Sequence, residues 1–460
     1  MKRFASLFAT GLLLASATLV VSGNEGARAA EVSFEPDGAL PLVYVNVAVK
    51  AGAVTDPAGQ SGLTNFMGEM LLRGTKNRTK EQLNLAIDQM GANLSVETRS
   101  EALIIRGAVL KTQLEPFLAL INEVLTRPSF PESEIRKLKS EITSGILEEL
   151  GRDPSLASRR FQRFLFQDHP YGKPVLGTVR DISRLTRPQI LAQYERLIRD
   201  PNLVVVGTGD AETSKIEAWS KALGQARSKG GKNGDKPIEK VAAPQDSPVA
   251  RYQIIDKPDR TQTQINGGQI GVKLTDKNYF PLYLANYTFG GGSFSSRMMV
   301  EIRVKRGWSY GANSYFRHGL QPRLWSFKIF PKSTDTPEAL AYTLGMIRNL
   351  KKGGITAEEL SFAKDSLINS AGFTYNTPKK RVENKLLERT LDLPDGFMRS
   401  YAPELAKLSL SDVNSAVEQY FKPDQMAVSV LGTAKDLKAP MAKALGIKEE
   451  QIQVVPYTQE

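Results

Sequence analysis

The chain runs twice through one order of predicted elements, and this repeat constrains its fold more than any other feature. Each half begins with a strand of alternating residues, at 42–52 and 263–274, and ends with an apolar strand, at 202–210 and 426–434. Between them, each half has an apolar helix, further strands, an amphipathic helix and a helix with an acidic start. This matched order predicts an α+β fold of two homologous domains, each a mostly antiparallel sheet with helices packed on one face.

A polar segment separates the two halves. Residues 225–249 are rich in Gly, Lys, Pro and Asp and show no apolar period, which is typical of a linker or a long exposed loop. We therefore predict an N-terminal domain over residues 32–224 and a C-terminal domain over residues 250–450.

The first residues predict export. Lys2 and Arg3 precede an apolar run, and Ala27-Arg28-Ala29 forms a small-x-small cleavage site, so residues 1–29 are typical of a secretory signal peptide. We expect a periplasmic or secreted protein with no stable membrane insertion after signal cleavage. An uncleaved anchor is the alternative.

Composition excludes several kinds of chemistry. The chain has no cysteine, which removes thiol nucleophiles and thiolate metal ligands. Its net charge is +12, but basic and acidic residues are interspersed, so we do not expect nucleic acid as a partner. The two histidines, His169 and His318, are far apart in the sequence, and a zinc site usually needs several His or Cys ligands. We expect structural roles for both.

The stretch "SGLTNFMGEMLLRGT" (61–75) predicts an amphipathic helix. Ser61 is the expected N-cap, and Arg73-Gly74 is the expected end. Gly68 stands in the middle of this helix, where glycine costs about 1 kcal/mol relative to alanine. A close packing contact at Gly68 would explain its presence. The apolar stripe of the helix consists of Leu63, Phe66, Met67, Met70 and Leu71.

Six phrases, taken together and in order, resemble the insulinase-like zinc peptidases, such as pitrilysin and mitochondrial processing peptidase. The resemblance covers about residues 35–445. It implies a chain whose two domains form half of a clamshell. The phrases are "GLTNFMGEMLLRGT", "AIDQMGANLSVETRSE", "RPSFPESEI", "HPYGKPVLGT", "FGGGSFSSRMMVEIRVKRGWSYGANSYF" and the closing "VLGT".

Catalytic members of that family carry the zinc motif H-x-x-E-H on the first helix, and a later glutamate completes the site. The resemblance places Asn65, Gly68 and Glu69 at the motif positions and Gly145 at the later glutamate. Glu148 or Glu149 could be that glutamate only if the alignment were shifted by three or four residues. Asparagine is a poor zinc ligand, and glycine neither binds metal nor accepts a proton. The resemblance therefore predicts a degenerate metal site, no bound metal and no hydrolysis by this chain alone.

The second half keeps another part of the family pattern. Family members use an Arg and a Tyr seven residues apart to hold the substrate backbone beside the zinc, and "RVKRGWSY" places Arg303 and Tyr310 at that spacing. Both side chains are hydrogen-bond donors suited to a carbonyl oxygen. A surface Arg with a sheet-core Tyr is the alternative. The preceding "FGGGSFSSR" (289–297) fits no nucleotide-binding pattern, so we interpret it as a tight turn.

The resemblance, with these residues at its motif positions, implies a zinc-free, substrate-binding subunit of a heteromeric peptidase. A partner chain with H-x-x-E-H would carry the zinc, and this chain would contribute Arg303 and Tyr310 to the partner's active site. Peptides or unfolded proteins would be the substrates. The alternative is a non-catalytic peptide-binding or scaffold protein with the same fold.

Overall fold

The computed structural model describes residues 31–199, 202–228 and 238–459. The predicted signal peptide (1–29) and the central part of the predicted linker (229–237) lie outside these ranges. Within the described ranges, no helix is long and apolar enough to cross a membrane.

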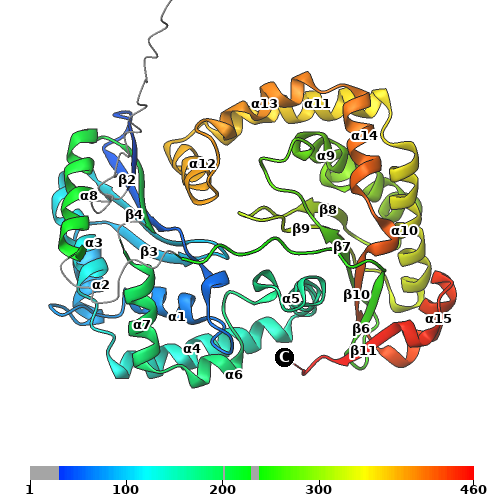
Figure 1. The fold of residues 1–460 in the computed structure, drawn as a ribbon, viewed down its shortest axis with the longest axis horizontal. Coiled ribbons are helices and arrows are strands. Elements are labelled where there is room, and N and C mark those ends of the chain that lie inside the picture. Colours follow the sequence, from blue (N-terminus) through cyan, green and yellow to red (C-terminus); the bar gives the residue numbers. More distant parts are fainter. Residues whose placement is uncertain (1–30, 200–201, 229–237, 460) are drawn as a thin grey trace, which may run out of the picture.

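Two mixed sheets form the framework, one from each half of the chain (Figure 1). In each sheet the predicted alternating and closing strands lie side by side and antiparallel, as β2 with β5 and as β7 with β10. The α+β fold predicted from the repeat is confirmed. The first sheet has the order β1(Glu31–Pro36), β5(Leu203–Gly209), β2(Leu42–Val49), β4(Leu103–Leu110), β3(Asn93–Thr98). The second has the order β11(Ile452–Pro456), β6(Arg251–Asp256), β10(Ala427–Gly432), β7(Gln264–Ile270), β9(Leu324–Ile329), β8(Ala312–Phe316).

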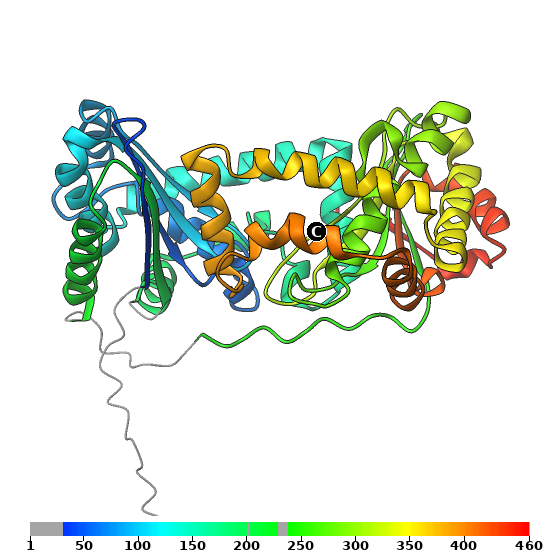
Figure 2. The ribbon, with the colours of Figure 1, turned by 90° about the horizontal axis from the view of Figure 1, so that it is seen from above.

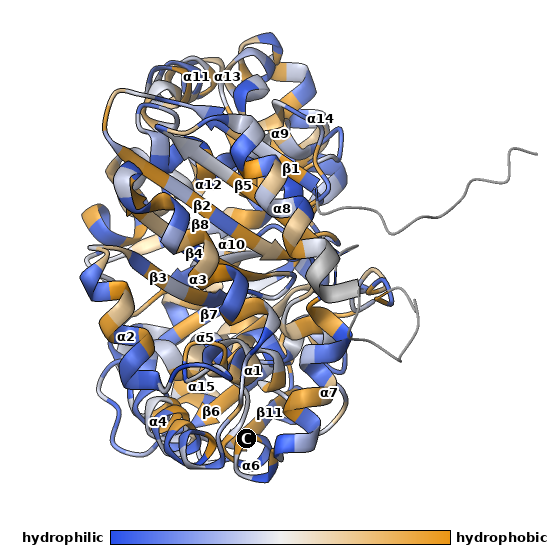
Figure 3. Cartoon of the chain, turned by 90° about the vertical axis from the view of Figure 1, so that its left-hand side faces the viewer, coloured by the Kyte–Doolittle hydropathy of each residue, from blue (hydrophilic) through white to orange (hydrophobic). Residues whose placement is uncertain are grey.

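Helices cover one face of each sheet and bury its apolar residues. Val45 and Val47 of β2, for example, join one core with Phe117 and Ile121. The covering helices contain both hydrophobic and hydrophilic residues, which Figure 3 shows in orange and blue for helices of the first half. In the first half the helices are α1(Leu63–Met70), α2(Lys80–Gln89), α3(Leu114–Thr126), α4(Glu132–Gly151), α6(Val179–Arg184), α7(Arg187–Leu197) and α8(Thr213–Ser228). In the second they are α9(Tyr279–Asn286), α10(Thr336–Gly353), α11(Ala357–Ala371), α13(Phe397–Lys407), α14(Leu410–Tyr420) and α15(Ala434–Leu445).

The opposite face of the first sheet is covered by a helix from the second half. Ala48 and Ile104 alternate with the residues that face the first core, and they pack against Val382 and Leu386 of α12(Pro378–Thr390). An ion pair of 2.9 Å between Arg389 and Glu31 adds to this contact. In Figure 2 the yellow and orange helices α11, α12 and α13 run from the second sheet to the first.

The first half covers the second sheet in return. Leu156 of α5(Asp153–Phe166) packs with Ile255 and Leu431, and Phe161 of the same helix packs with Ile270. Asp153, at the start of α5, pairs with Lys257 at 2.6 Å. The two halves therefore exchange one helix each, and each half needs the other to bury both faces of its sheet.

Candidate functional site

Helix α1, which carries three of the predicted motif positions, begins later than the sequence suggested. Gly62, in the left-handed region with a φ of 90°, occupies the N-cap, so the prediction of Ser61 as the cap is wrong. The carboxylate of Asp56 supplies the cap: it accepts hydrogen bonds from the backbone N–H groups of Gly62 (2.8 Å) and Thr64 (2.9 Å). Burial raises the pKa of Asp56 to about 6. The helix ends at Met70, before the predicted Arg73-Gly74.

Two of the motif positions on α1 belong to the core. Asn65 is 7% exposed, and Gly68 is buried as well. A Cβ atom added at Gly68 would lie 2.5 Å from Cδ1 of Leu103 and 3.1 Å from Cγ1 of Val96. The predicted close packing contact is therefore present, and it joins α1 to strands β3 and β4 where catalytic relatives need a glutamate.

An arginine, rather than a metal, links the end of α1 to α4. The guanidinium of Arg73 donates to both carboxylate oxygens of Glu141, and it donates to Glu134 at 3.3 Å. Glu69, the third motif position, lies near this cluster, and its burial raises the pKa of its carboxyl group. Glu141 stands one helical turn before Gly145, so the cationic arginine holds the acidic face of α4 next to the position of the family's later glutamate.

Position 145 has no ligand. Gly145 is exposed on α4, and a Cβ atom there would meet no atom within 4 Å. The two alternatives on the same helix are engaged elsewhere, because Glu148 lies 3.8 Å from Arg152 and Glu149 lies 3.6 Å from Arg159.

The donor set at the degenerate site does not fit zinc. It offers one amide and one carboxylate, from Asn65 and Glu69, whereas a zinc site takes three or four His, Cys or carboxylate ligands. Across the described ranges, no group of three or more His, Cys, Asp or Glu side chains could hold a metal ion. His169 has a structural role, since its Nδ1 accepts from the backbone N–H of Tyr171 at 3.1 Å.

Arg303 and Tyr310, unlike the metal-site positions Asn65 and Gly68, form a stack with an exposed tyrosine ring. Arg303 lies on a π-helix (Met299–Lys305), and its guanidinium stacks over the ring of Tyr310 at 4.3 Å and over that of Phe294 at 4.8 Å. Tyr310 is 80% exposed, so the alternative of a sheet-core tyrosine is wrong. Within the described part of the chain, no carboxylate lies within ion-pair distance of Arg303. The pair can therefore donate hydrogen bonds to another molecule.

The glycine-rich segment before this π-helix is a packed turn. Tyr287–Gly291 forms a short π-helix, and a Cβ atom at Gly290 would lie 2.7 Å from the backbone nitrogen of Ser314. Ser293 takes a positive φ of 54°, which places Phe294 on the surface with 64% of its area exposed. This turn thus supports the exposed ring on which Arg303 lies.

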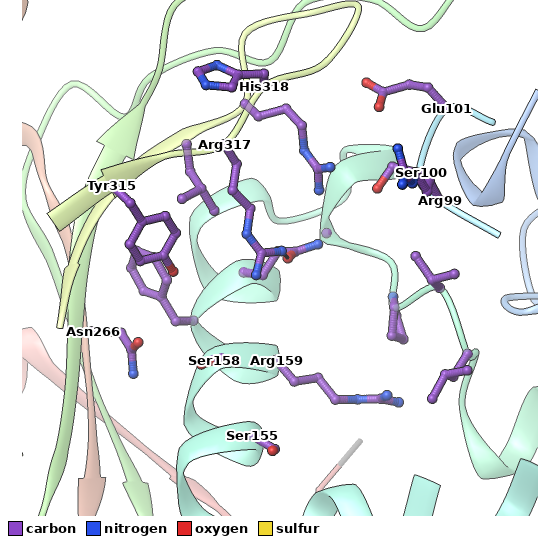
Figure 4. Close-up of a pocket in the computed structure, with 18 of the residues that line it drawn as sticks. Arg99, Ser100, Glu101, Ser155, Ser158, Arg159, Asn266, Tyr315, Arg317 and His318 are labelled. Atoms are coloured by element: carbon purple, nitrogen blue, oxygen red, sulfur yellow. Dashed lines mark hydrogen bonds between the residues drawn. The ribbon is translucent and has the colours of Figure 1, made fainter. Parts of the chain in front are cut away.

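A cavity of about 730 Å³ lies where the two halves meet (Figure 4). It is lined by α5, by the turn between β3 and β4, by the loop after β8 and by the end of α12. Sequence reasoning did not find this cavity, because its residues come from segments far apart in the chain.

Comparison with known proteins identifies the family. The model described as "Insulinase (Peptidase family M16)" matches residues 35–179, and the model described as "Peptidase M16 inactive domain" matches residues 184–367. The chain belongs to the insulinase (M16) family. Together the two matches cover more than half of the chain.

Relatives within this family include proteins with and without a peptidase name. A protein of Helicobacter pylori described as "Non-peptidase homolog YmxG" is 22% identical over 95% of this chain and 99% of its own length. An "Uncharacterized zinc protease" of Rickettsia bellii is 26% identical over 59% of this chain and 64% of its own length.

Two solved structures share the fold. An M16 inactive domain from Pseudomonas fluorescens has a TM-score of 0.80 at 23% identity and covers 88% of this chain and 96% of its own. A protease from Helicobacter pylori has a TM-score of 0.78 at 18% identity and covers 88% of this chain and 98% of its own. This chain is thus an insulinase-like peptidase homologue whose zinc-motif positions carry Asn65, Gly68 and Glu69.

Proposed function

We propose that this chain is the zinc-free, substrate-binding subunit of a heteromeric M16 peptidase in the periplasm or outside the cell. The observation that carries the proposal is the exposed stack of Arg303 on Tyr310, in a chain whose own metal-site positions include a buried Asn65, a buried Gly68 and an exposed Gly145. The pair would donate hydrogen bonds to the carbonyl oxygen of a peptide held in the partner's zinc site. The partner would supply H-x-x-E-H and the metal.

The first sheet supports the binding of extended peptides. Strand β3 pairs only with β4 among the described strands, so the outer backbone groups of β3 can pair with an added strand. Peptides or unfolded proteins provide such strands, and main-chain pairing does not depend on their sequence. The proposed substrate class follows from this edge.

The test is native co-purification. The tagged full-length protein should bring down an M16 chain with an intact H-x-x-E-H motif from its own host, and the complex should contain zinc and cleave a quenched peptide. The tagged chain purified alone should contain no stoichiometric zinc and leave the peptide intact. One tightly bound zinc per isolated chain would contradict the proposal.

A non-catalytic peptide-binding or scaffold protein is the second candidate. The name of the Helicobacter pylori relative, "Non-peptidase homolog", favours it. Co-purification without any H-x-x-E-H chain, together with retained peptide binding, would support this function instead.

A further inference from the structure

The cavity between the two halves is lined by more cations than anions. Four arginines face two glutamates, and His318 adds no charge, because burial lowers its pKa to about 4. In Figure 4, Arg317 and His318 come from the second half, and Arg99, Glu101 and Arg159 come from the first. The charged lining residues are Arg99, Arg159, Arg317, Arg323, Glu101 and Glu149.

Most of these charges are already compensated. Arg99 donates to Glu97 at 2.6 Å, and Arg159 lies 3.6 Å from Glu149. Glu101 accepts hydrogen bonds from the Tyr171 hydroxyl at 2.5 Å and from a backbone N–H at 3.0 Å. These contacts leave Glu101 with two further arginines, and the two arginines exceed its negative charge by one positive charge.

Arg317 and Arg323 are those two. No Asp or Glu in the described ranges lies within ion-pair distance of either guanidinium. Arg323 is only 8% exposed, its Nε has no hydrogen-bond partner, and it stacks over the Tyr171 ring at 4.8 Å. Burial lowers the pKa of Arg323; the charge of Glu101 partly opposes this, and the nearby charge of Arg317 lowers the pKa again. A bound anion would relieve both lowering effects.

The rest of the lining favours an amide-containing ligand over a simple anion. Asn266 of β7 is 3% exposed, and its Oδ1 has no donor, although buried acceptors are usually paired. Phe161, Leu324 and Leu387 supply apolar walls. The volume of about 730 Å³ suits a ligand larger than an inorganic ion.

We infer that this cavity binds the end of a short peptide, with the C-terminal carboxylate on Arg317 and Arg323 and a backbone N–H on Asn266. The peptide's side chains would lie against the apolar walls. Strand β3 leads directly into the turn Arg99–Ala102 that lines the cavity, so a peptide on the β3 edge lies close to it. The inference takes its ligand class from the proposed function, but binding here needs neither zinc nor a partner.

The test uses the purified full-length chain alone, with calorimetry at pH 7. The probe is an N-acetylated Ala/Leu tetrapeptide with a free C-terminal carboxylate, compared with its C-terminal amide and with succinate. We expect the acid to bind at least tenfold more tightly than the amide, since charge-assisted hydrogen bonds are lost. Arg317→Gln should weaken binding of the acid by a similar factor. Arg184→Gln, an exposed arginine on α6, should leave it unchanged.

Any of four results would overturn the inference. The acid and the amide could bind equally, Arg317→Gln could bind the acid as wild type does, or the acid could fail to bind. Succinate binding as tightly as the tetrapeptide would assign the cavity to small dicarboxylates instead. Since Arg317 is exposed, its variant should fold normally, and a melting curve checks this. None of these outcomes decides whether a zinc-bearing partner exists, which co-purification tests separately.

Discussion

The two halves of the chain share one fold, but their candidate functional segments differ in solvent exposure. In the first half, Asn65 and Gly68 are buried in the packing of α1, and Arg73 joins α1 to α4. In the second half, Arg303 and Tyr310 stay on the surface, and Tyr310 is 80% exposed. The first segment is part of the core, and the second leaves the ring of Tyr310 open to solvent.

The backbone of the two segments also differs, since one is a regular α-helix and the other is π-helical. Helix α1 is a regular helix of eight residues, while the Arg303 segment is a π-helix preceded by a second, shorter π-helix. π-Helical turns cost stability and are frequent at functional sites. The comparison shows that the segment with the degenerate metal-site positions is regular and buried, whereas the segment with Arg303 and Tyr310 is irregular and leaves Tyr310 exposed.

The largest expected effect concerns the halves themselves. Residues 31–228 expressed alone lose α12, which buries one face of the first sheet, so this fragment should not fold cooperatively. Urea unfolding followed by circular dichroism measures this. A cooperative transition for the fragment, similar to that of the whole chain, would show that the exchanged helices are dispensable.

Substitution of the two site glycines should separate packing from chemistry. Gly68→Glu places a carboxylate against Leu103 and Val96, and we expect a loss of about 3 kcal/mol in the free energy of unfolding with no gain of hydrolysis. Gly145→Glu is the matched control, because open space surrounds that position, and it should lose no stability relative to wild type. Peptide cleavage by the Gly68→Glu variant alone would refute the assignment of α1 to structure.

A smaller loss is expected at the cap of α1. Asp56→Ala removes the acceptor of two backbone N–H groups and of the Thr64 hydroxyl, which should cost about 2 kcal/mol of stability. Equilibrium unfolding in urea gives the value. Ser61→Ala serves as the comparison, because Ser61 was the cap predicted from the sequence. A larger loss for Ser61→Ala than for Asp56→Ala would restore that prediction.

The smallest effect is a gain. Gly145→Ala should raise the free energy of unfolding by about 0.5–1 kcal/mol, since alanine is the better helix former and its Cβ meets no atom within 4 Å. Thermal melting is sensitive enough to detect it. Destabilisation by this substitution would mean that Gly145 serves a contact absent from the isolated chain.

Much of the fold could be predicted from the sequence. The alternating strand predicted at 42–52 is β2(Leu42–Val49), and the amphipathic helix predicted for the first half is α3(Leu114–Thr126). Both predictions succeeded because the spacing of hydrophobic residues reflects both the local structure and the buried face. The exchange of α5 and α12 could not be predicted. The apolar faces of these two helices indicate that each one packs against another element. The local sequence does not indicate which of the two sheets that element belongs to.

The candidate site divides in the same way. The motif positions could be located from the residues next to them in the sequence. The exposure of Tyr310, in contrast, depends on how β8 and the π-helix pack together. The cap from Asp56 was missed because the chain turns back between that residue and α1. The cavity was missed because both halves have to dock before it exists.

The central claim is that Arg303 and Tyr310 act in a partner's zinc site, and steady-state hydrolysis of a quenched peptide by the reconstituted pair tests it most directly. Arg303→Ala and Tyr310→Phe should each lower kcat and kcat/KM about a hundredfold, on the order of 3 kcal/mol, since each removes a donor that acts on the developing oxyanion. Arg184→Ala and Tyr457→Phe are the matched controls and should leave turnover unchanged. Melting curves and co-elution confirm folding and pairing. Wild-type turnover by folded, paired Arg303→Ala and Tyr310→Phe would contradict the shared site.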